Sequence, residues 1–149
     1  MADGDDNAMR AGEVAAEVPL AADAGVYFIG VIHTPWTERG ACPKRGSPDG
    51  PLCAIVVDER WRAALTDITD HPKIQVLYWM HRARRDLVLQ TPHRTGKPTG
   101  SFALRSPVRP NPIASSVVAL VGIEDGTLLV RGLDCLDGTP LIDLKPDRP

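Results

Sequence analysis

The sequence predicts a mainly β protein whose short strands close into a single compact barrel, with one or two short helices. Six or seven apolar runs, each of strand length, are separated by turns rich in glycine, proline and aspartate. Only one stretch repeats its apolar residues at helical spacing. A sheet of this kind usually closes on itself or doubles into a sandwich, because closure removes unpaired strand edges. With 149 residues, the chain has room for one domain with a real core.

The beginning of the chain differs from the rest in charge. Residues 1–25 hold six acidic residues against a single arginine, a net charge of −5, and their alanines form no helical apolar stripe. Residues 26–149 hold 16 Lys and Arg against 13 Asp and Glu, a net charge of +3. We therefore expect a disordered acidic tail over residues 1–25 and one folded barrel domain over residues 26–149.

Apolar residues mark the first strands and the helix. Val26–Ile32 is β-branched and aromatic, and Cys53–Val57 is a second apolar run, so both indicate strands. The charged, glycine- and proline-rich stretch between them, Thr37–Pro51, indicates a loop. Asp58 then offers an N-cap for a short helix. Its apolar face would consist of Trp61, Ala64, Leu65 and Ile68.

Ile74–Met80 is apolar on both faces, which is typical of a central strand. The Asp-Gly pair within Glu124–Thr127 is the signal of a tight hairpin. The other strands that we expect are Gly100–Leu104, Ser116–Ile123, Leu128–Gly132 and Leu141–Leu144. The polar stretch after Met80 has room for one further short strand at Asp86–Gln90.

Several classes of protein lack support in the sequence. Cys42, Cys53 and Cys135 are odd in number and widely spaced, and the four histidines show no His-x-x-x-His spacing, so neither a disulfide framework nor a metal site is expected. The glycine fingerprints of dinucleotide folds and phosphate-binding loops are missing. No apolar stretch is long enough to span a bilayer, and the chain lacks a secretory signal, so we expect a soluble, cytoplasmic protein.

The stretch Gly100–Ser116 combines a strand pattern with a stiff loop. Pro107, Pro110 and Pro112 fix their own φ angles and push the preceding residues towards extended geometry. Such a loop has little entropy left to lose on binding, and Arg105 and Arg109 bring planar donor forks suited to carboxylates and phosphates. The alternative is a structural proline turn with solvated arginines.

Four blocks of sequence, in order, resemble the motifs of the TsaA-like, or TrmO, family of S-adenosylmethionine-dependent tRNA methyltransferases. The signature block is Gly100–Ile113, and the other three are Ile29–Pro35, Leu77–His81 and Gly132–Pro146. The resemblance covers roughly residues 26–146. It implies a β-barrel that binds S-adenosylmethionine without a Rossmann sheet and usually forms a homodimer. The implied activity is methylation of N6 on the threonylcarbamoyl-modified adenosine at position 37 of threonine tRNA.

The resemblance also implies which residues contact the cofactor. They match Pro43, Lys44, Arg45, His81, Arg82, Arg105, Val117, Asp134, Cys135, Leu136, Asp137 and Gly138. The family's Pro-Arg-Gln block is Pro-Lys-Arg here, and longer members continue into a second domain. Candidate catalytic residues are His81, Arg105 and Asn111. We expect no covalent cysteine intermediate, because no cysteine lies in an activating context.

Each of these roles has a plainer alternative. Arg105 suits the carboxylate of the cofactor, but an ion pair with Asp134 or Asp143 would also satisfy it. The turn at Asp134–Gly138 suits the adenine edge, but Asp-Gly is common in ordinary hairpin turns. His81 has the right ordinary pKa for a base near neutrality, although a lone histidine is more often packed or solvated.

A basic stretch offers contacts to tRNA phosphates, and the alternative is a solvated charged loop. Its members, with the nearby loop arginine, are Arg84, Arg85, Arg94, Lys97 and Arg109. The leading hypothesis is therefore a tRNA methyltransferase. The alternatives are a non-catalytic S-adenosylmethionine- or RNA-binding module or regulator, and a methyltransferase that acts on a small molecule.

Overall fold

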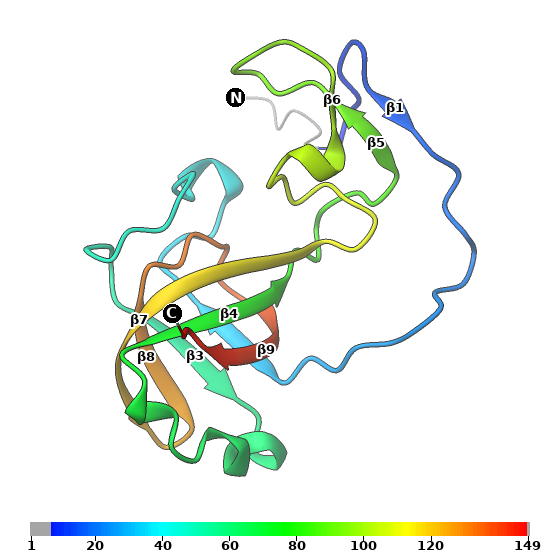
Figure 1. Cartoon of the computed structure of the whole chain (residues 1–149). Coiled ribbons are helices and arrows are strands. Elements are labelled where there is room, and N and C mark those ends of the chain that lie inside the picture. The colour runs from blue at the N-terminus through cyan, green and yellow to red at the C-terminus, as the bar shows by residue number, and fades with distance from the viewer. Residues whose placement is uncertain (1–6, 149) are drawn as a thin grey trace. The chain divides into compact units, whose positions relative to one another are not determined.

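The computed structural model describes residues 7–148 and divides the chain into two compact units, each described here by itself. The barrel unit consists of residues 26–79 and 114–149, and the small-sheet unit consists of residues 1–25 and 80–113. Figure 1 labels most of the strands of both. The mainly β class and the closed barrel predicted from the sequence are confirmed.

Six strands close the barrel, in the order β2-β3-β8-β7-β4-β9. Closure depends on the last strand, because β9 pairs in antiparallel fashion with both β2 and β4. No open edge is then left in this sheet. The strands are β2 (Gly30–His33), β3 (Cys53–Val57), β4 (Lys73–Trp79), β7 (Ile113–Glu124), β8 (Thr127–Arg131) and β9 (Thr139–Pro146).

The barrel interior is filled by alternate residues of its strands, as the pleat requires. In β3, β4 and β8 buried and half-exposed positions alternate without a break. The fully buried aliphatic side chains include Ile32, Ile55, Ile74, Leu128 and Leu141. These strands could be predicted because their apolar residues recur with the same period of two.

Strand register defines two ends of the barrel. Ile32 pairs with Thr139, Cys53 with Val130, and Tyr78 with Leu141, which brings one set of strand termini together. We call this the turn end, because it carries the loop of residues 34–52 and the turn of residues 132–138. The opposite end, which we call the pocket end, carries the hairpin at Asp125–Gly126 and the connection from β3 to β4.

The hairpin prediction is confirmed, whereas the first strand is shorter than expected. Asp125 and Gly126 both have positive φ, 48° and 75°, as the twist of a two-residue hairpin demands. The expected strand Val26–Ile32 becomes β2, which begins only at Gly30. Tyr27 and Phe28 precede it with side chains that contact the rings of Trp61 and Trp79 instead of entering the core.

The predicted helix after β3 is present as two 3-10 segments, η2 (Glu59–Leu65) and η3 (Ile68–Asp70). Asp58 occupies the predicted N-cap position of η2, but its side chain makes no capping hydrogen bond. Asp67, with a φ of 68°, separates the two segments, and Leu65 is the buried member of η2. The apolar area that this face buries is too small to stabilise a longer α-helix.

The small-sheet unit contains three strands in the order β1-β5-β6 and a short 3-10 segment. Their bounds are β1 (Val14–Ala15), β5 (Leu87–Gln90), β6 (Thr99–Gly100) and η4 (Ser101–Ala103). A disordered tail was expected over residues 1–25, and residues 1–6 of it lie outside the described residues. Within the rest of that stretch, β1 pairs with β5.

Glu13 explains how this acidic stretch is held in place. Its carboxylate accepts hydrogen bonds from the backbone N–H groups of Arg10, at 2.7 Å, and Thr91, at 2.9 Å. Burial favours the neutral acid, but these two bonds and the positive charges of Arg10 and Arg84 outweigh burial, so the pKa of Glu13 is lowered. A two-residue strand fixed by one carboxylate leaves no periodic signal in the sequence.

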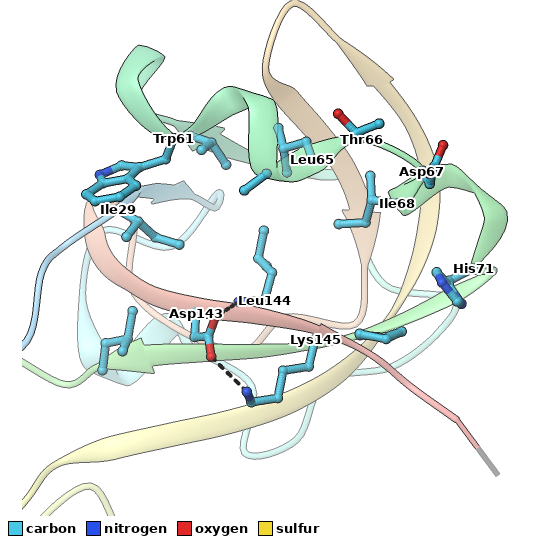
Figure 2. Close-up of a pocket in the computed structure, with 14 residues that line it drawn as sticks. Ile29, Trp61, Leu65, Thr66, Asp67, Ile68, His71, Asp143, Leu144 and Lys145 are labelled. Atoms are coloured by element: carbon cyan, nitrogen blue, oxygen red, sulfur yellow. Dashed lines mark hydrogen bonds and ion pairs between the residues drawn. The ribbon is translucent and has the colours of Figure 1, made fainter.

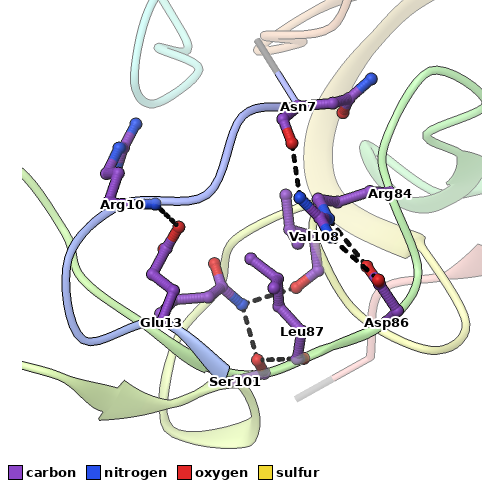
Figure 3. Close-up of polar contacts among 9 residues, drawn as sticks. Asn7, Arg10, Glu13, Arg84, Asp86, Leu87, Ser101 and Val108 are labelled. Atoms are coloured by element: carbon purple, nitrogen blue, oxygen red, sulfur yellow. Dashed lines mark hydrogen bonds and ion pairs between the residues drawn. The ribbon is translucent and has the colours of Figure 1, made fainter. Parts of the chain in front are cut away.

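The expected strand Gly100–Leu104 is wrong beyond Gly100. The chain leaves the sheet there and turns through η4, with Phe102 82% exposed to solvent. Ser101 causes the turn, because its buried hydroxyl donates to the carbonyl oxygen of Leu87 at 2.7 Å and accepts from the Gln90 amide at 2.7 Å. Figure 3 shows this pair of bonds. Alternating Phe and Leu therefore did not mark a buried strand face.

Candidate functional site

The loop of residues 34–52 packs directly against the turn of residues 132–138 at the turn end. A side chain at Gly46 would meet the carbonyl oxygen of Gly132, with a Cβ atom only 1.7 Å from it, so two backbones touch there. The Arg131 guanidinium also donates to the carbonyl oxygen of Gly50 at 2.8 Å. The loop that carries Pro43, Lys44 and Arg45 is thereby fixed beside the turn.

The residues that follow β2 hold the turn from its other side. Thr34 donates from its hydroxyl to the carbonyl oxygen of Cys135 at 2.8 Å, and the Asp137 N–H donates to the carbonyl oxygen of Trp36 at 2.7 Å. One carboxylate oxygen of Asp137 lies 3.0 Å from Nδ1 of His33 and accepts from the Thr34 N–H at 3.2 Å. Gly138, with a φ of 82°, completes a turn shape that a side chain would strain.

The second acidic residue of the turn, Asp134, is bound from the barrel interior. Its Oδ1 atom accepts a hydrogen bond of 2.8 Å from the Tyr78 hydroxyl, and the same hydroxyl lies 2.8 Å from Oγ of Ser116. Tyr78 is only 3% exposed. Burial, reinforced by the negative charge of Asp134, raises the pKa of Tyr78 far above its ordinary value.

Two cation-bearing residues of the loop remain available to a ligand. Lys44 and Arg45 are exposed, and within the described residues their side chains have no hydrogen bond or ion pair. The charge of Asp134 reaches the same loop: burial first, and then Asp134, raises the pKa of the Cys42 thiol, while Arg39 lowers it. Cations and carboxylates therefore stand side by side at this rim of the barrel.

The three thiols are poor nucleophiles. Burial raises the pKa of Cys135 to about 12 and also raises that of Cys53. The thiolate is the reactive form, so both groups are inert near neutral pH. No disulfide joins the three cysteines.

Except for Val117, the predicted site residues that remain belong to the small-sheet unit. His81, Arg82 and Arg105 are exposed there. Asn111 is also exposed, and its side-chain oxygen accepts from Arg85 at 3.2 Å, while Arg85 also donates to the carbonyl oxygen of Pro110 at 2.6 Å. Arg85 thus ties the proline-rich loop to the stretch after β4.

Two further members of the predicted tRNA-binding set have partners inside their own unit. Arg84 makes a bidentate pair with Asp86, at 2.7 and 2.9 Å, and Figure 3 shows it beside a bond to the backbone of Asn7. The Arg84 hydrogen bond lowers the pKa of Asp86. Arg109 donates to the carbonyl oxygens of its own loop, those of Leu104 and Ser106.

Arg94 and Lys97 differ from these arginines. Both are exposed in the turn between β5 and β6, and their side chains have no hydrogen bond or ion pair among the residues that the structure describes. Of the predicted set, they are therefore the members whose charges are most available. Val117, the remaining predicted cofactor contact, lies on β7 with an exposed side chain.

A cavity of about 370 Å³ lies at the pocket end, and none of the predicted site residues lines it. Figure 2 shows Trp61, Leu65 and Ile68 on one side and the β9 residues on the other. The charged pair on its β9 wall, Asp143 and Lys145, is mutually satisfied at 3.0 Å. This cavity lacks the turn and the loop cations, so we place the candidate site at the turn end.

The described residues contain neither a candidate metal cluster nor a helix of membrane-spanning character. No three of their His, Cys, Asp and Glu side chains form a cluster that could hold a metal ion. Within residues 7–148 no helix has the length and the hydropathy that crossing a bilayer requires.

Sequence reasoning missed the residues that support the site. Tyr78, Ser116, His33, Thr34 and Trp36 hold the turn, yet none was singled out. One signal was available: a tyrosine inside a strand that is apolar on both faces must find a partner for its hydroxyl. Which partner it finds depends on the barrel register, and a single sequence does not contain that register.

The sequence matches a known domain family and several named proteins. The model of the tRNA-methyltransferase O N-terminal domain matches residues 31–149. The chain is 46% identical to the "Probable S-adenosyl-L-methionine-binding protein VirR" of Rhizobium radiobacter, over 94% of this chain and 80% of that protein. A stretch of 58 residues, 39% of this chain and 14% of the other, is 43% identical to the mouse tRNA (adenine(37)-N6)-methyltransferase.

A solved structure has the same fold. The crystal structure of TrmO from Pseudomonas aeruginosa superposes with a TM-score of 0.70 at 30% identity, over 86% of this chain. The match spans 57% of the TrmO chain, so this protein covers little more than half the length of that relative. Because the family model covers most of the sequence and the barrel agrees with a TrmO crystal structure, this chain belongs to the tRNA-methyltransferase O N-terminal domain family.

Proposed function

We propose that this protein is an S-adenosylmethionine-dependent tRNA methyltransferase that binds its cofactor at the turn end of the barrel. In its finer form, the proposal is methylation of N6 on threonylcarbamoyladenosine 37 of threonine tRNA. The observation that carries the proposal is the packing of the loop that contains Pro43–Arg45, through Gly46 and Gly50, against Arg131 and Gly132, which lead into the Asp134–Gly138 turn. Two segments far apart in the sequence, both matching family cofactor motifs, thus meet in one place.

The residues at this end fit the chemical parts of S-adenosylmethionine. Its carboxylate needs a cation, which Lys44 or Arg45 would supply. Its ammonium and ribose hydroxyls need acceptors, which Asp134 and the backbone carbonyls of the turn would supply. Gly138 has no side chain, so a flat base can approach the backbone of the turn closely.

When bound, S-adenosylmethionine supplies an electrophilic methyl group. The contribution of this chain is then to orient the donor and the accepting base and to exclude water between them. Alignment of this kind lowers a barrier by up to about 7–11 kcal/mol. The inert thiols of Cys53 and Cys135 leave direct transfer as the simpler course. His81, Arg105 and Asn111 remain candidates for contact with the reacting groups.

Exposed cations and sequence similarity to a named tRNA methyltransferase support the proposal that tRNA is the substrate. Arg94 and Lys97 offer exposed cations for phosphates, and the mouse relative is named for tRNA adenine 37. We also propose a homodimer, for which the outward face of β7 leaves Val117, Val121 and Ile123 exposed. Sedimentation of the purified chain tests the dimer, and a single monomeric species at all concentrations would refute it.

Nucleoside mass analysis of tRNA tests the main proposal. Bulk tRNA that carries threonylcarbamoyladenosine without the N6 methyl group is incubated with the protein and S-adenosylmethionine. Its nucleosides are then separated and identified by mass spectrometry. We expect one added methyl group on threonylcarbamoyladenosine and none when the protein is omitted. A methyl group on another nucleoside would retain the tRNA methyltransferase and refute the finer substrate.

A second candidate is a protein that binds S-adenosylmethionine without transferring its methyl group. The name of the Rhizobium radiobacter relative, which speaks of binding alone, favours it. Calorimetry with S-adenosylmethionine separates the two: heat of binding without any methylated nucleoside would select the second candidate. If the protein neither binds S-adenosylmethionine nor transfers its methyl group, both candidate functions are wrong.

A further inference from the structure

Tyr78 joins three elements of the barrel through one hydroxyl group. It is the residue before the end of β4, it lies against Ser116 of β7, and it reaches Asp134 in the turn. Both distances are 2.8 Å. No other hydrogen bond to the Asp134 carboxylate occurs among residues 7–148, so Oδ2 has no partner there.

The direction of the two bonds follows from the number of protons. A carboxylate can only accept, so the single hydrogen of the phenol must point at Asp134. Ser116 must then donate its own hydrogen to the phenol oxygen, which gives a directed chain from serine to tyrosine to aspartate. Burial and the nearby carboxylate raise the pKa of Tyr78, so the phenol keeps its proton, and its role as donor, throughout the working pH range.

We propose that Tyr78 is a positioning residue for the cofactor, which fixes the Asp134 carboxylate so that Oδ2 accepts an O–H or N–H donor of S-adenosylmethionine. This inference rests on the proposed function, since it assumes that the cofactor binds at the turn. With Oδ1 engaged by the buried phenol, the carboxylate loses the freedom to rotate. The aspartate is then preorganised before the ligand arrives.

The same pair of strands contains a matched contact that does not reach the turn. The side-chain amide of Gln75 donates to Oγ of Ser115 at 2.8 Å, again from β4 to β7. Both contacts join polar side chains across the same strand pair. The Tyr78 contact continues to an acidic residue at the rim, whereas the Gln75 amide bonds to Ser115, so Gln75 serves as the control for any general effect on the barrel.

The first experiment measures the affinity for S-adenosylmethionine by calorimetry in Tyr78→Phe, Gln75→Leu and the wild type. Tyr78→Phe removes one oxygen atom and retains the ring. A hydrogen bond to a charged group is at stake, so we expect about 10-fold weaker binding in Tyr78→Phe. Gln75→Leu is expected to bind like the wild type. Equal affinity of Tyr78→Phe and the wild type would overturn the inference.

A second measurement separates positioning from a merely structural role. In an Asp134→Ala background, Tyr78→Phe should cause no further loss of affinity, because the phenol then has no carboxylate to hold. A structural role predicts the same loss in both backgrounds, and that result would also overturn the inference. Thermal melts of all variants show whether each is folded at the temperature of the titration.

These outcomes are distinguishable from a failure of the proposed function. If the wild type binds S-adenosylmethionine but methylates no tRNA, the function fails while the role of Tyr78 in binding is still decided by the variants. If the wild type shows no binding, the function and this inference are both overturned.

Discussion

The two ends of the barrel differ in how their polar groups are used. At the turn end, side chains from β2, β4 and β8 hold a loop and a turn together, and the loop carries exposed cations. At the pocket end, a cavity has mostly apolar walls, and its charged pair is satisfied internally. A site for a zwitterionic nucleoside is thus better identified by converging donors and acceptors than by empty volume.

The sharpest test of this difference uses thiol reactivity, because all three cysteines lie at the turn end. Burial raises the pKa of Cys135 to about 12. At pH 8 we therefore expect it to be alkylated about 1,000-fold more slowly than an ordinary thiol. Because a raised pKa keeps the thiol neutral, labelling should still be increasing at pH 10, as read by mass spectrometry of the intact protein.

Cys42 is the internal control for that experiment, since it is only partly buried and should react before the other two. Rapid labelling of Cys135 in the folded protein would mean that the turn opens to solvent. The hydrogen bonds at the turn end would then not hold the turn closed.

Charge reversal should break the comparison if the ends have been assigned wrongly. The double variant Lys44→Glu and Arg45→Glu replaces two exposed cations of the loop, and we expect S-adenosylmethionine to bind about 100-fold more weakly, as titration calorimetry would show. The matched variant at the other end, Lys145→Glu, should retain full affinity. If Lys145→Glu alone bound S-adenosylmethionine more weakly, the site would have to be assigned to the pocket end.

Gly46→Ala tests whether the loop must touch the turn. The added methyl group would lie 1.7 Å from the carbonyl oxygen of Gly132, so one backbone must move away. We expect about 10-fold weaker cofactor binding together with a lower melting temperature. Gly40→Ala is the control, because a Cβ atom there meets nothing within 4 Å. Wild-type affinity in Gly46→Ala would show that the contact is dispensable.

The smallest effect is expected from the ion pair at the pocket end. Asp143 and Lys145 are 45% and 56% exposed, and exposed pairs contribute little because water and salt screen them. Lys145→Met should change the free energy of unfolding by less than about 1 kcal/mol, as measured by urea denaturation. A larger loss would mean that this pair supports the walls of the cavity.

Much of the barrel could be predicted because its strands repeat with a period of two. Cys53–Val57 was predicted with its observed bounds, and the Asp-Gly hairpin gave the turn between β7 and β8. The proposed site was located through family motifs, which preserve residue types without giving their contacts. The packing of Gly46 on Gly132 became visible only in three dimensions.

The remaining features depend on partners far away in the sequence. Ser101 ends a strand because a carbonyl of β5 accepts its hydroxyl, and Glu13 holds β1 through the backbone of Thr91. Neither residue carries a local signal for its partner. The α-helix predicted after β3 was wrong for a related reason. The apolar residues there recur at helical spacing, but too little of the face that they form is buried to favour an α-helix.

The order of strands in the barrel has a consequence for how such proteins diversify. The chain departs after β4 and returns at β7, the strand beside it, so residues 80–113 are an excursion from a junction that a short hairpin would otherwise make. Lengthening or rewriting an excursion of this kind leaves the register of the surrounding wall intact. The insert can therefore change during evolution while the barrel stays the same.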